Sequence, residues 1–127
     1  MPIANLIGGW LGILAGVIAG AVIGLFFHDD GWMGGYASYR RRLMRLGHVA
    51  FFGLGFLNLA FAATANGLAL PAPYSAVASW ALIAGAIAMP ACCFLAAWKK
   101  PLRHLFPIPV ACVLAGVLAI LIGWWCR

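Results

Sequence analysis

Residues 2–27 read PIANLIGGWLGILAGVIAGAVIGLFF, and this stretch decides the fold because it contains no charged side chain. A helix needs about 20 apolar residues to cross the hydrocarbon core of a bilayer, so the stretch is long enough to span a membrane. Glycine recurs in it at every fourth position, at Gly8, Gly12, Gly16, Gly20 and Gly24. Glycine is a poor helix former in water, but in a membrane it lets two helix backbones approach closely. The stretch therefore predicts a membrane-spanning helix that packs against other protein.

The composition of the whole chain also indicates a membrane protein. Of its 127 residues, 66% are hydrophobic and only 8% are charged. A soluble domain of this length carries far more charge. The formal net charge of +6 does not indicate binding to nucleic acid, because nearly all the basic residues flank apolar runs, where topology signals lie. We therefore expect a protein of the lipid bilayer without a nucleic-acid partner.

Three further apolar runs follow the first one. We expect an all-α fold in which residues 1–127 form one domain, with four transmembrane helices in a compact bundle. Each run has the length that a span with modest tilt requires. The expected spans are residues 3–27, 47–70, 74–98 and 105–125.

The charges of the loops predict the orientation of the chain. Basic residues occur in the loops at residues 28–46 and 99–104, whereas the second loop and the N-terminal tail have none and the C-terminus has only Arg127. The positive-inside rule therefore places both basic loops in the cytoplasm and both termini outside. We expect the inner, cytoplasmic membrane of a bacterium, with anionic lipids at the basic loops.

The five glycines of the first span, here called the glycine stripe, do not follow a straight line along the helix. A step of four residues turns a helix by about 400°, which leaves a drift of about 40° per glycine. One partner helix crossing at about −40° uses about three glycines, and the others face a second neighbour. That neighbour belongs either to the same bundle or to another subunit, and the sequence leaves both open.

The expected topology brings all three histidines to the cytoplasmic face. His28 ends the first span, His48 begins the apolar part of the second, and His104 precedes the fourth. Histidine and the cysteines of the later spans are ligand types for haem iron, copper or zinc. Histidine also suits a membrane interface without any ligand, and no tight spacing such as CxxC occurs. If a haem or a metal ion is bound, we expect a pair of these histidines to hold it, with His48 the best placed.

A cationic face is expected on the second helix if that helix begins near Ser38. The residues that helical spacing then places on one face are Arg41, Arg45, His48, Phe52 and Gly55. Such a face suits an anionic lipid headgroup at Arg41 and Arg45. The alternative is a specific cofactor with an anionic or polar group, such as a haem propionate or a quinone.

Asn58 lies near the middle of the second expected span. An asparagine at membrane depth commonly hydrogen-bonds across helices, so we expect a packing role for it. Alternatively, Asn58 lines a small oligomeric channel or transporter together with Thr64 and Asn66, because polar residues within a membrane often mark a functional site.

Several activities lack their sequence signals. None of the spans has an acidic or basic residue in its core, whereas small multidrug transporters depend on a membrane-embedded glutamate. The chain also lacks the arginine of the first span and the threonine-serine-phenylalanine run of the fluoride channels. Because no nucleophile–base pair and no phosphate-binding glycine loop occurs, we do not expect an enzyme.

The favoured interpretation is therefore a small accessory subunit that packs onto other integral-membrane subunits of a larger complex. The collected histidines and sulfurs favour a complex of an electron-transport chain. Two alternatives stay open: a membrane electron-transfer protein with haem or metal ligands at its cytoplasmic face, and a small oligomeric channel or transporter.

Overall fold

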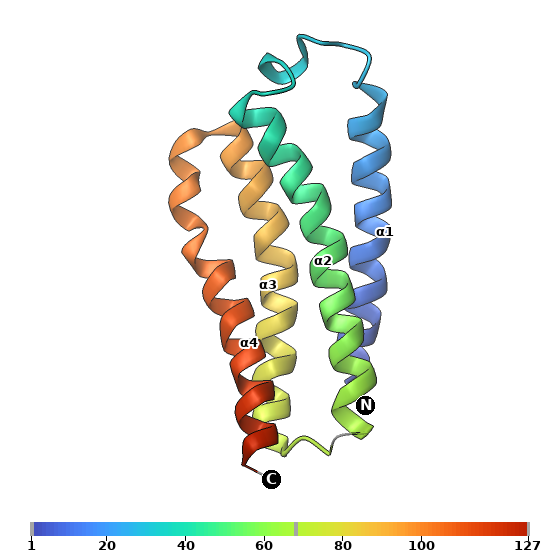
Figure 1. The fold of residues 1–127 in the computed structure, drawn as a ribbon, viewed down its shortest axis with the longest axis vertical. Coiled ribbons are helices and arrows are strands. Elements are labelled where there is room, and N and C mark those ends of the chain that lie inside the picture. Colours follow the sequence, from blue (N-terminus) through green and yellow to red (C-terminus); the bar gives the residue numbers. More distant parts are fainter. Residues whose placement is uncertain (1, 68, 127) are drawn as a thin grey trace.

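The computed structural model describes residues 2–67 and 69–126, except for the side chain of Asn66. Within this part of the chain all regular structure is helical (Figure 1). The long helices are α1 (Ile3–Leu25), α2 (Tyr39–Gly67), α3 (Ala72–Trp98) and α4 (Pro107–Trp125). Two short 3₁₀-helices lie in the loops, η1 (Trp32–Gly34) and η2 (Lys100–Leu105). The all-α fold class is confirmed, and the four long helices are long and apolar enough to cross a membrane.

The helix ends follow from local sequence. Ser38 precedes α2, and its Oγ accepts a hydrogen bond from the backbone N–H of Arg41 at 3.1 Å, as an N-cap does. The helix therefore begins well before the apolar part that was expected from Gly47. Pro71 directly precedes α3, and Pro107 is the first residue of α4. Proline suits a first helical turn because its φ is fixed and the N–H that it lacks would have no partner there.

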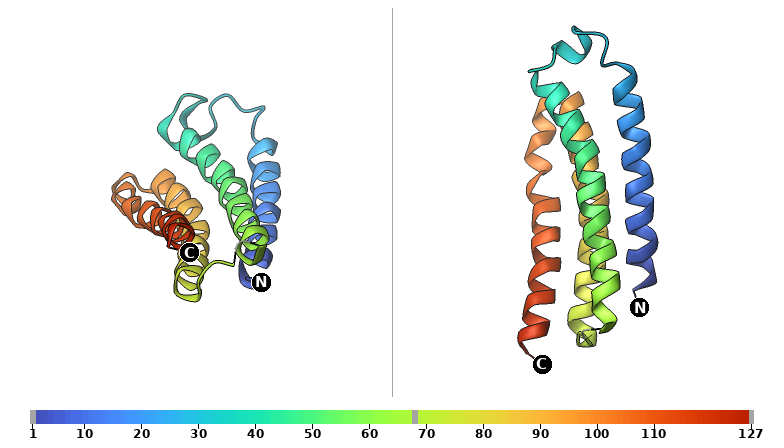
Figure 2. Two further views of the ribbon diagram at one scale, coloured as in Figure 1. Left: turned by 60° about the horizontal axis from the view of Figure 1, so that its bottom comes forward. Right: turned by 45° about the vertical axis from the view of Figure 1, so that its right-hand side comes forward.

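The helices alternate in direction, and each packs on its neighbour in the sequence. The closest pairs are α1 with α2, α2 with α3, and α3 with α4, while α1 approaches α3 over a shorter stretch. Among the described residues, α1 and α4 do not approach each other. The four helices are therefore arranged in a row in the order of the sequence. Figure 2 shows α1 and α4 at the opposite ends of this row. The bundle is therefore more open than the compact one that the sequence predicts.

Small residues bring α3 and α4 together. A methyl group at Gly85 would lie 2.6 Å from Cγ2 of Val113, and one at Gly116 would lie 2.8 Å from Cδ2 of Leu82. Gly123 faces Leu70, at the turn between α2 and α3. The buried side chains around this contact form the main core, at Phe61, Ala65, Leu70, Ala78, Leu82 and Ala119. Close backbone approach at small residues is how membrane helices gain contact area.

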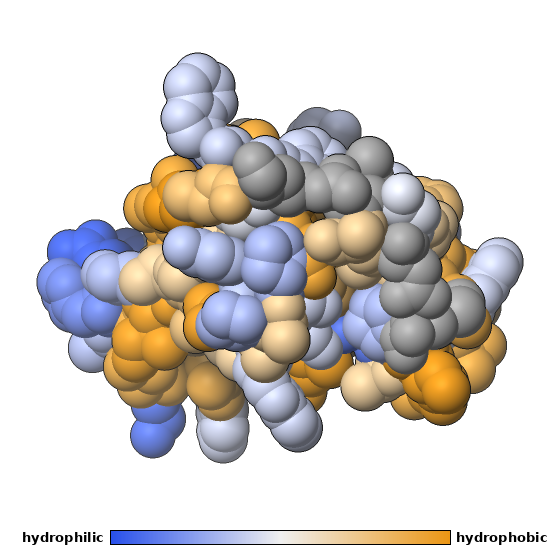
Figure 3. Space-filling view, turned by 90° about the horizontal axis from the view of Figure 1, so that it is seen from below, coloured by the Kyte–Doolittle hydropathy of each residue, from blue (hydrophilic) through white to orange (hydrophobic). Residues whose placement is uncertain are grey.

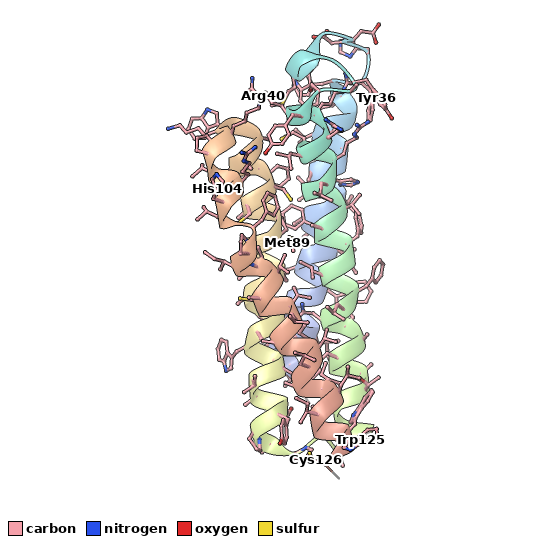
Figure 4. All side chains as sticks on the ribbon, turned by 60° about the vertical axis from the view of Figure 1, so that its left-hand side comes forward. Tyr36, Arg40, Met89, His104, Trp125 and Cys126 are labelled. Carbon is pink, nitrogen blue, oxygen red and sulfur yellow. The ribbon has the colours of Figure 1, made fainter. Side chains whose placement is uncertain are left out.

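The two ends of the molecule differ in chemistry. Tyr36, Arg40 and His104 lie at the end that carries the first and third loops, here called the loop end, whereas Trp125 and Cys126 lie at the other, here called the terminus end (Figure 4). Viewed from the terminus end, hydrophobic and intermediate side chains make up most of the face, and the strongly hydrophilic ones lie mainly at its left edge (Figure 3). The basic loops thus share one end, and residues 2 and 126, the described ends of the chain, lie at the other (Figure 1).

Candidate functional site

Part of the glycine stripe packs against α2. A methyl group at Gly12 would lie 3.3 Å from Cα of Gly55, and one at Gly16 would lie 2.8 Å from the ring of Phe52. At Gly20 an added methyl group would overlap the ring of His48. Two patterns that the sequence shows separately, the stripe on α1 and the face of α2, are therefore the two sides of one contact.

The ends of the stripe do not join this contact. Around a methyl group at Gly8 or Gly24 there is no atom within 4 Å among the described residues. Gly9 takes the place of Gly8 in the contact, since a methyl group there would lie 2.8 Å from the carbonyl oxygen of Gly55 and 2.6 Å from Cγ of Leu59. The drift of the stripe around α1 therefore leaves open space beside the Cα atoms of Gly8 and Gly24 in the described structure.

A polar network joins α1, α2 and α3. Asn5 donates through Nδ2 to Oδ1 of Asn58 at 2.7 Å and to the carbonyl of Ser79 at 3.2 Å, and the hydroxyl of Ser79 donates to Oδ1 of Asn5. Asn58 donates in turn to the carbonyls of Leu54 at 2.9 Å and Leu82 at 3.3 Å. Asn5 and Asn58 are both buried. Because each amide has its partners within the chain, the network holds three helices in register.

Sequence reasoning missed Asn5 and Ser79, although a signal for Asn5 existed. Asn5 is the only amide side chain in the first apolar stretch, where an unpaired amide would be costly. Thr64 has a different environment, because it is exposed and its hydroxyl donates at 2.7 Å to the carbonyl of Ala60 in its own helix. The side chain of Asn66 lies outside the described part. The described structure therefore does not bring Thr64 to the network of Asn58.

An apolar groove of about 690 Å³ runs between α1 and α3. Phe51 and Asn58 of α2 also line it. The α1 side consists mainly of small residues, whereas the α3 side has large ones. The groove is lined by Ala4, Ile7, Gly8, Leu11, Gly12 and Ala15 from α1 and by Trp80, Ile83, Ala86, Ile87, Ala91 and Phe94 from α3. Gly8, where an added methyl group would meet no described atom within 4 Å, faces this space.

The histidines occupy three separate places. His28 is exposed in the first loop, and His104 is exposed on η2, which packs on α3 and α4. His48 lies on α2 with its Nδ1 2.9 Å from the carbonyl oxygen of Gly16. A carbonyl only accepts, so Nδ1 carries the proton in this bond. Within residues 2–67 and 69–126, the structure gathers no group of three His, Cys, Asp or Glu side chains that could hold a metal ion.

Arg41 and Arg45 bind the first loop of the chain itself. The Arg41 side chain is only 3% exposed, and its guanidinium lies 5.6 to 5.7 Å from the ring centres of Phe27, Trp32 and Tyr36. It also donates at 3.3 Å to the carbonyl of Asp29. Arg45 lies 4.1 Å from the ring centre of Tyr36 and donates to that residue's carbonyl at 3.2 Å. The cationic end of the α2 face thus holds the loop down on the α1–α2 pair.

The chain matches no protein-family model, no curated protein and no solved structure. The geometry of the groove, the polar network and the charged loops is therefore the basis for the functional argument.

Proposed function

We propose that this chain is a small integral-membrane subunit that receives a transmembrane helix of a larger complex in the groove between α1 and α3. The observation that carries the proposal is the open groove itself, with its wall of small residues on α1. Two helices of the same chain form its sides, yet no described segment fills it. A gap of this kind within a bundle is a contact that another helix can complete.

The shape of the groove favours a helix as its occupant. Ala4, Gly8, Gly12 and Ala15 follow one another at steps of four, four and three residues, which places them along one side of α1. At 1.5 Å per residue this side is about 17 Å long, or about three helical turns. Small residues at helical spacing allow a second backbone to approach closely, and lipid chains have no need of them.

The α3 side of the groove supplies the large contacts. Trp80 and Ile87 are 72% and 68% exposed, so most of their surface is available to a partner. A helix seated on the small residues of α1 would pack its flank against these side chains, as a ridge of large residues fits beside a groove of small ones. The proposed partner is therefore an apolar helix that carries small or medium side chains toward α1.

The proposal includes location and orientation. The four helices suit a membrane, and the basic loops lie together at one end. We place that end, with residues 28–46 and 99–104, in the cytoplasm and the termini outside, in the inner membrane of a bacterium, on the positive-inside rule. The assignment to an electron-transport complex rests on the sequence alone.

A test of the docking proposal is native mass spectrometry of the chain purified gently from its own membrane. We expect the wild type in a large assembly at fixed stoichiometry, Gly8→Leu outside the assembly, and Gly24→Leu still inside it. Both glycines have open surroundings in the chain, so both variants should remain folded, but only Gly8 lines the groove.

Circular dichroism and size-exclusion chromatography of the isolated variants check that both retain the helical fold. A wild type that runs alone or only with copies of itself contradicts the proposal, and so does a Gly8→Leu variant that stays in the assembly. An excess mass equal to haem on the isolated wild type would instead support the electron-transfer alternative.

A further inference from the structure

The cations at the loop end fall into two groups according to what their side chains contact. Three of those near the first loop contact other parts of the chain, whereas Arg42 is exposed. Arg41 is buried among aromatic rings, Arg45 donates to Tyr36, and Nε of Arg40 donates at 3.0 Å to the carbonyl of Ala97 near the end of α3. The acidic residues of the sequence, Asp29 and Asp30, are also in this loop. Most of the positive charge there therefore contacts other groups of the chain or is offset by the two carboxylates of the same loop.

The second basic loop has a different arrangement. Lys100, Arg103 and His104 are all exposed on η2, and together with Pro101 they border an open hollow of about 210 Å³ whose own walls are apolar. Nζ of Lys100 lies 5.6 Å from the ring centre of Tyr39, so part of its surface contacts α2. Residues three apart eclipse each other in a 3₁₀-helix, which brings Lys100 and Arg103 to the same side. The whole sequence has no other acidic residues, so residues 99–106 contain no carboxylate. This loop thus presents exposed hydrogen-bond donors and has no carboxylate of its own.

From this arrangement we infer that the exposed cations of η2 beside this hollow bind the phosphate group of an anionic ligand. Arginine and lysine donate to phosphate oxygens, and an imidazole adds a further nitrogen donor. The two sources of such a group are a phospholipid headgroup and free phosphate.

The position of the hollow favours the lipid headgroup as the source. It lies between the end of α3 at Trp98 and the start of α4 at Pro107, where two apolar helices reach the surface of the membrane. Basic pockets at this level bind anionic headgroups. The inference moves the expected lipid contact from Arg41 and Arg45 to Lys100 and Arg103, and it does not depend on the docking proposal.

The test compares two variants with the same loss of charge. Phosphatidylglycerol and phosphatidylcholine are titrated onto the detergent-solubilised full chain, and native mass spectrometry counts the bound lipids. For the wild type we expect one saturable phosphatidylglycerol with clear preference over phosphatidylcholine. The double variant Lys100→Gln/Arg103→Gln should weaken it by roughly 25-fold, since each surface cation near an anionic lipid contributes about fivefold.

The matched control is Arg42→Gln/Lys99→Gln, which removes two exposed cations at the same end that do not line the hollow. Equal weakening in both double variants overturns the inference, because it shows general attraction by charge. Binding without saturation, or equal binding of both lipids, also overturns it. Inorganic phosphate then separates the sources: displacement of the lipid supports a site for the phosphate group alone, and resistance to displacement supports the lipid headgroup.

Discussion

The few polar residues of this chain serve mainly to fix its helices and its first loop. Asn5, Asn58 and Ser79 form one buried hydrogen-bond network from three helices. Arg41 is buried without a carboxylate among the described contacts, and three aromatic rings and a carbonyl surround its charge. A guanidinium tolerates such a site better than an ammonium, because it is weakly hydrated and stacks on rings. Arg41 and Asn58, which resemble functional residues in the sequence, thus have partners within the chain.

Replacement of Asn58 tests the network. We expect Asn58→Leu to lower the free energy of unfolding by about 1–3 kcal/mol, because the Asn5 amide loses a buried partner. The control Thr64→Val removes an exposed hydroxyl that bonds within its own helix, and it should change stability by less than about 0.5 kcal/mol. Unfolding in mixed detergent micelles, followed by circular dichroism, measures both. Equal effects in the two variants would show that the network does not stabilise the fold.

Among the elements, α1 combines two kinds of contact on its two sides. One side packs against α2 through Gly9, Gly16 and Gly20, and the other borders the open groove at Gly8. Gly12 lies between the two sides, because it approaches Gly55 and also lines the groove. Because 3.6 residues complete a turn, adjacent residues lie about 100° apart around the helix. The difference between Gly8 and Gly9 therefore reports how α1 is rotated about its axis.

Alanine at these two adjacent positions tests that rotation. Gly9→Ala should destabilise the chain by about 1–3 kcal/mol, because the new methyl group meets the backbone of Gly55 and the packed helices must move apart. Gly8→Ala should be neutral or stabilise by up to about 1 kcal/mol, because alanine loses less conformational entropy in a helix and the space is open. The same detergent unfolding experiment compares them. A reversed order would show that α1 presents a different face to α2.

For the whole molecule, the main feature is the difference between its ends. Both basic loops lie at the loop end, and the described chain ends lie at the other (Figures 1 and 4). The four helices run in alternating directions, so the chain passes along the molecule an even number of times. Its two described ends therefore lie at the same end of the molecule. Under the positive-inside rule, the basic residues of both loops therefore favour the same side of a membrane.

Cysteine labelling tests this orientation. Cys126 is exposed, while Cys92 and Cys93 are buried and Cys112 is partly buried. A membrane-impermeant maleimide added to intact cells should therefore label Cys126 and lose its target in Cys126→Ser. In that background, Ala37→Cys places a thiol in the first loop at the opposite end, and it should react only after the membrane is permeabilised. Labelling of Ala37→Cys from outside intact cells would reverse the proposed orientation.

The sequence by itself determined the helices, their approximate ends and the segregation of charge. These depend on local properties: the length of each apolar run, the serine and prolines at the helix starts, and the position of arginine and lysine relative to the runs. It also predicted a close helix contact along the glycine stripe, Gly8 to Gly24, because a repeat of about four places residues near one side of a helix. None of this requires knowledge of which helix lies beside which.

Only the tertiary structure decided how the helices are rotated and which side chains remain free. In the structure Gly9, and not Gly8, lies at the α1–α2 contact. Asn58 belongs to one hydrogen-bond network with Asn5 and Ser79, and Arg41 is buried under the first loop. Each of these depends on contacts between residues far apart in the chain. A rotation of a helix by one residue turns its side chains by about 100° about the helix axis, and it would change all of these contacts. Periodicity limits that angle only loosely, so packing between helices had to determine it.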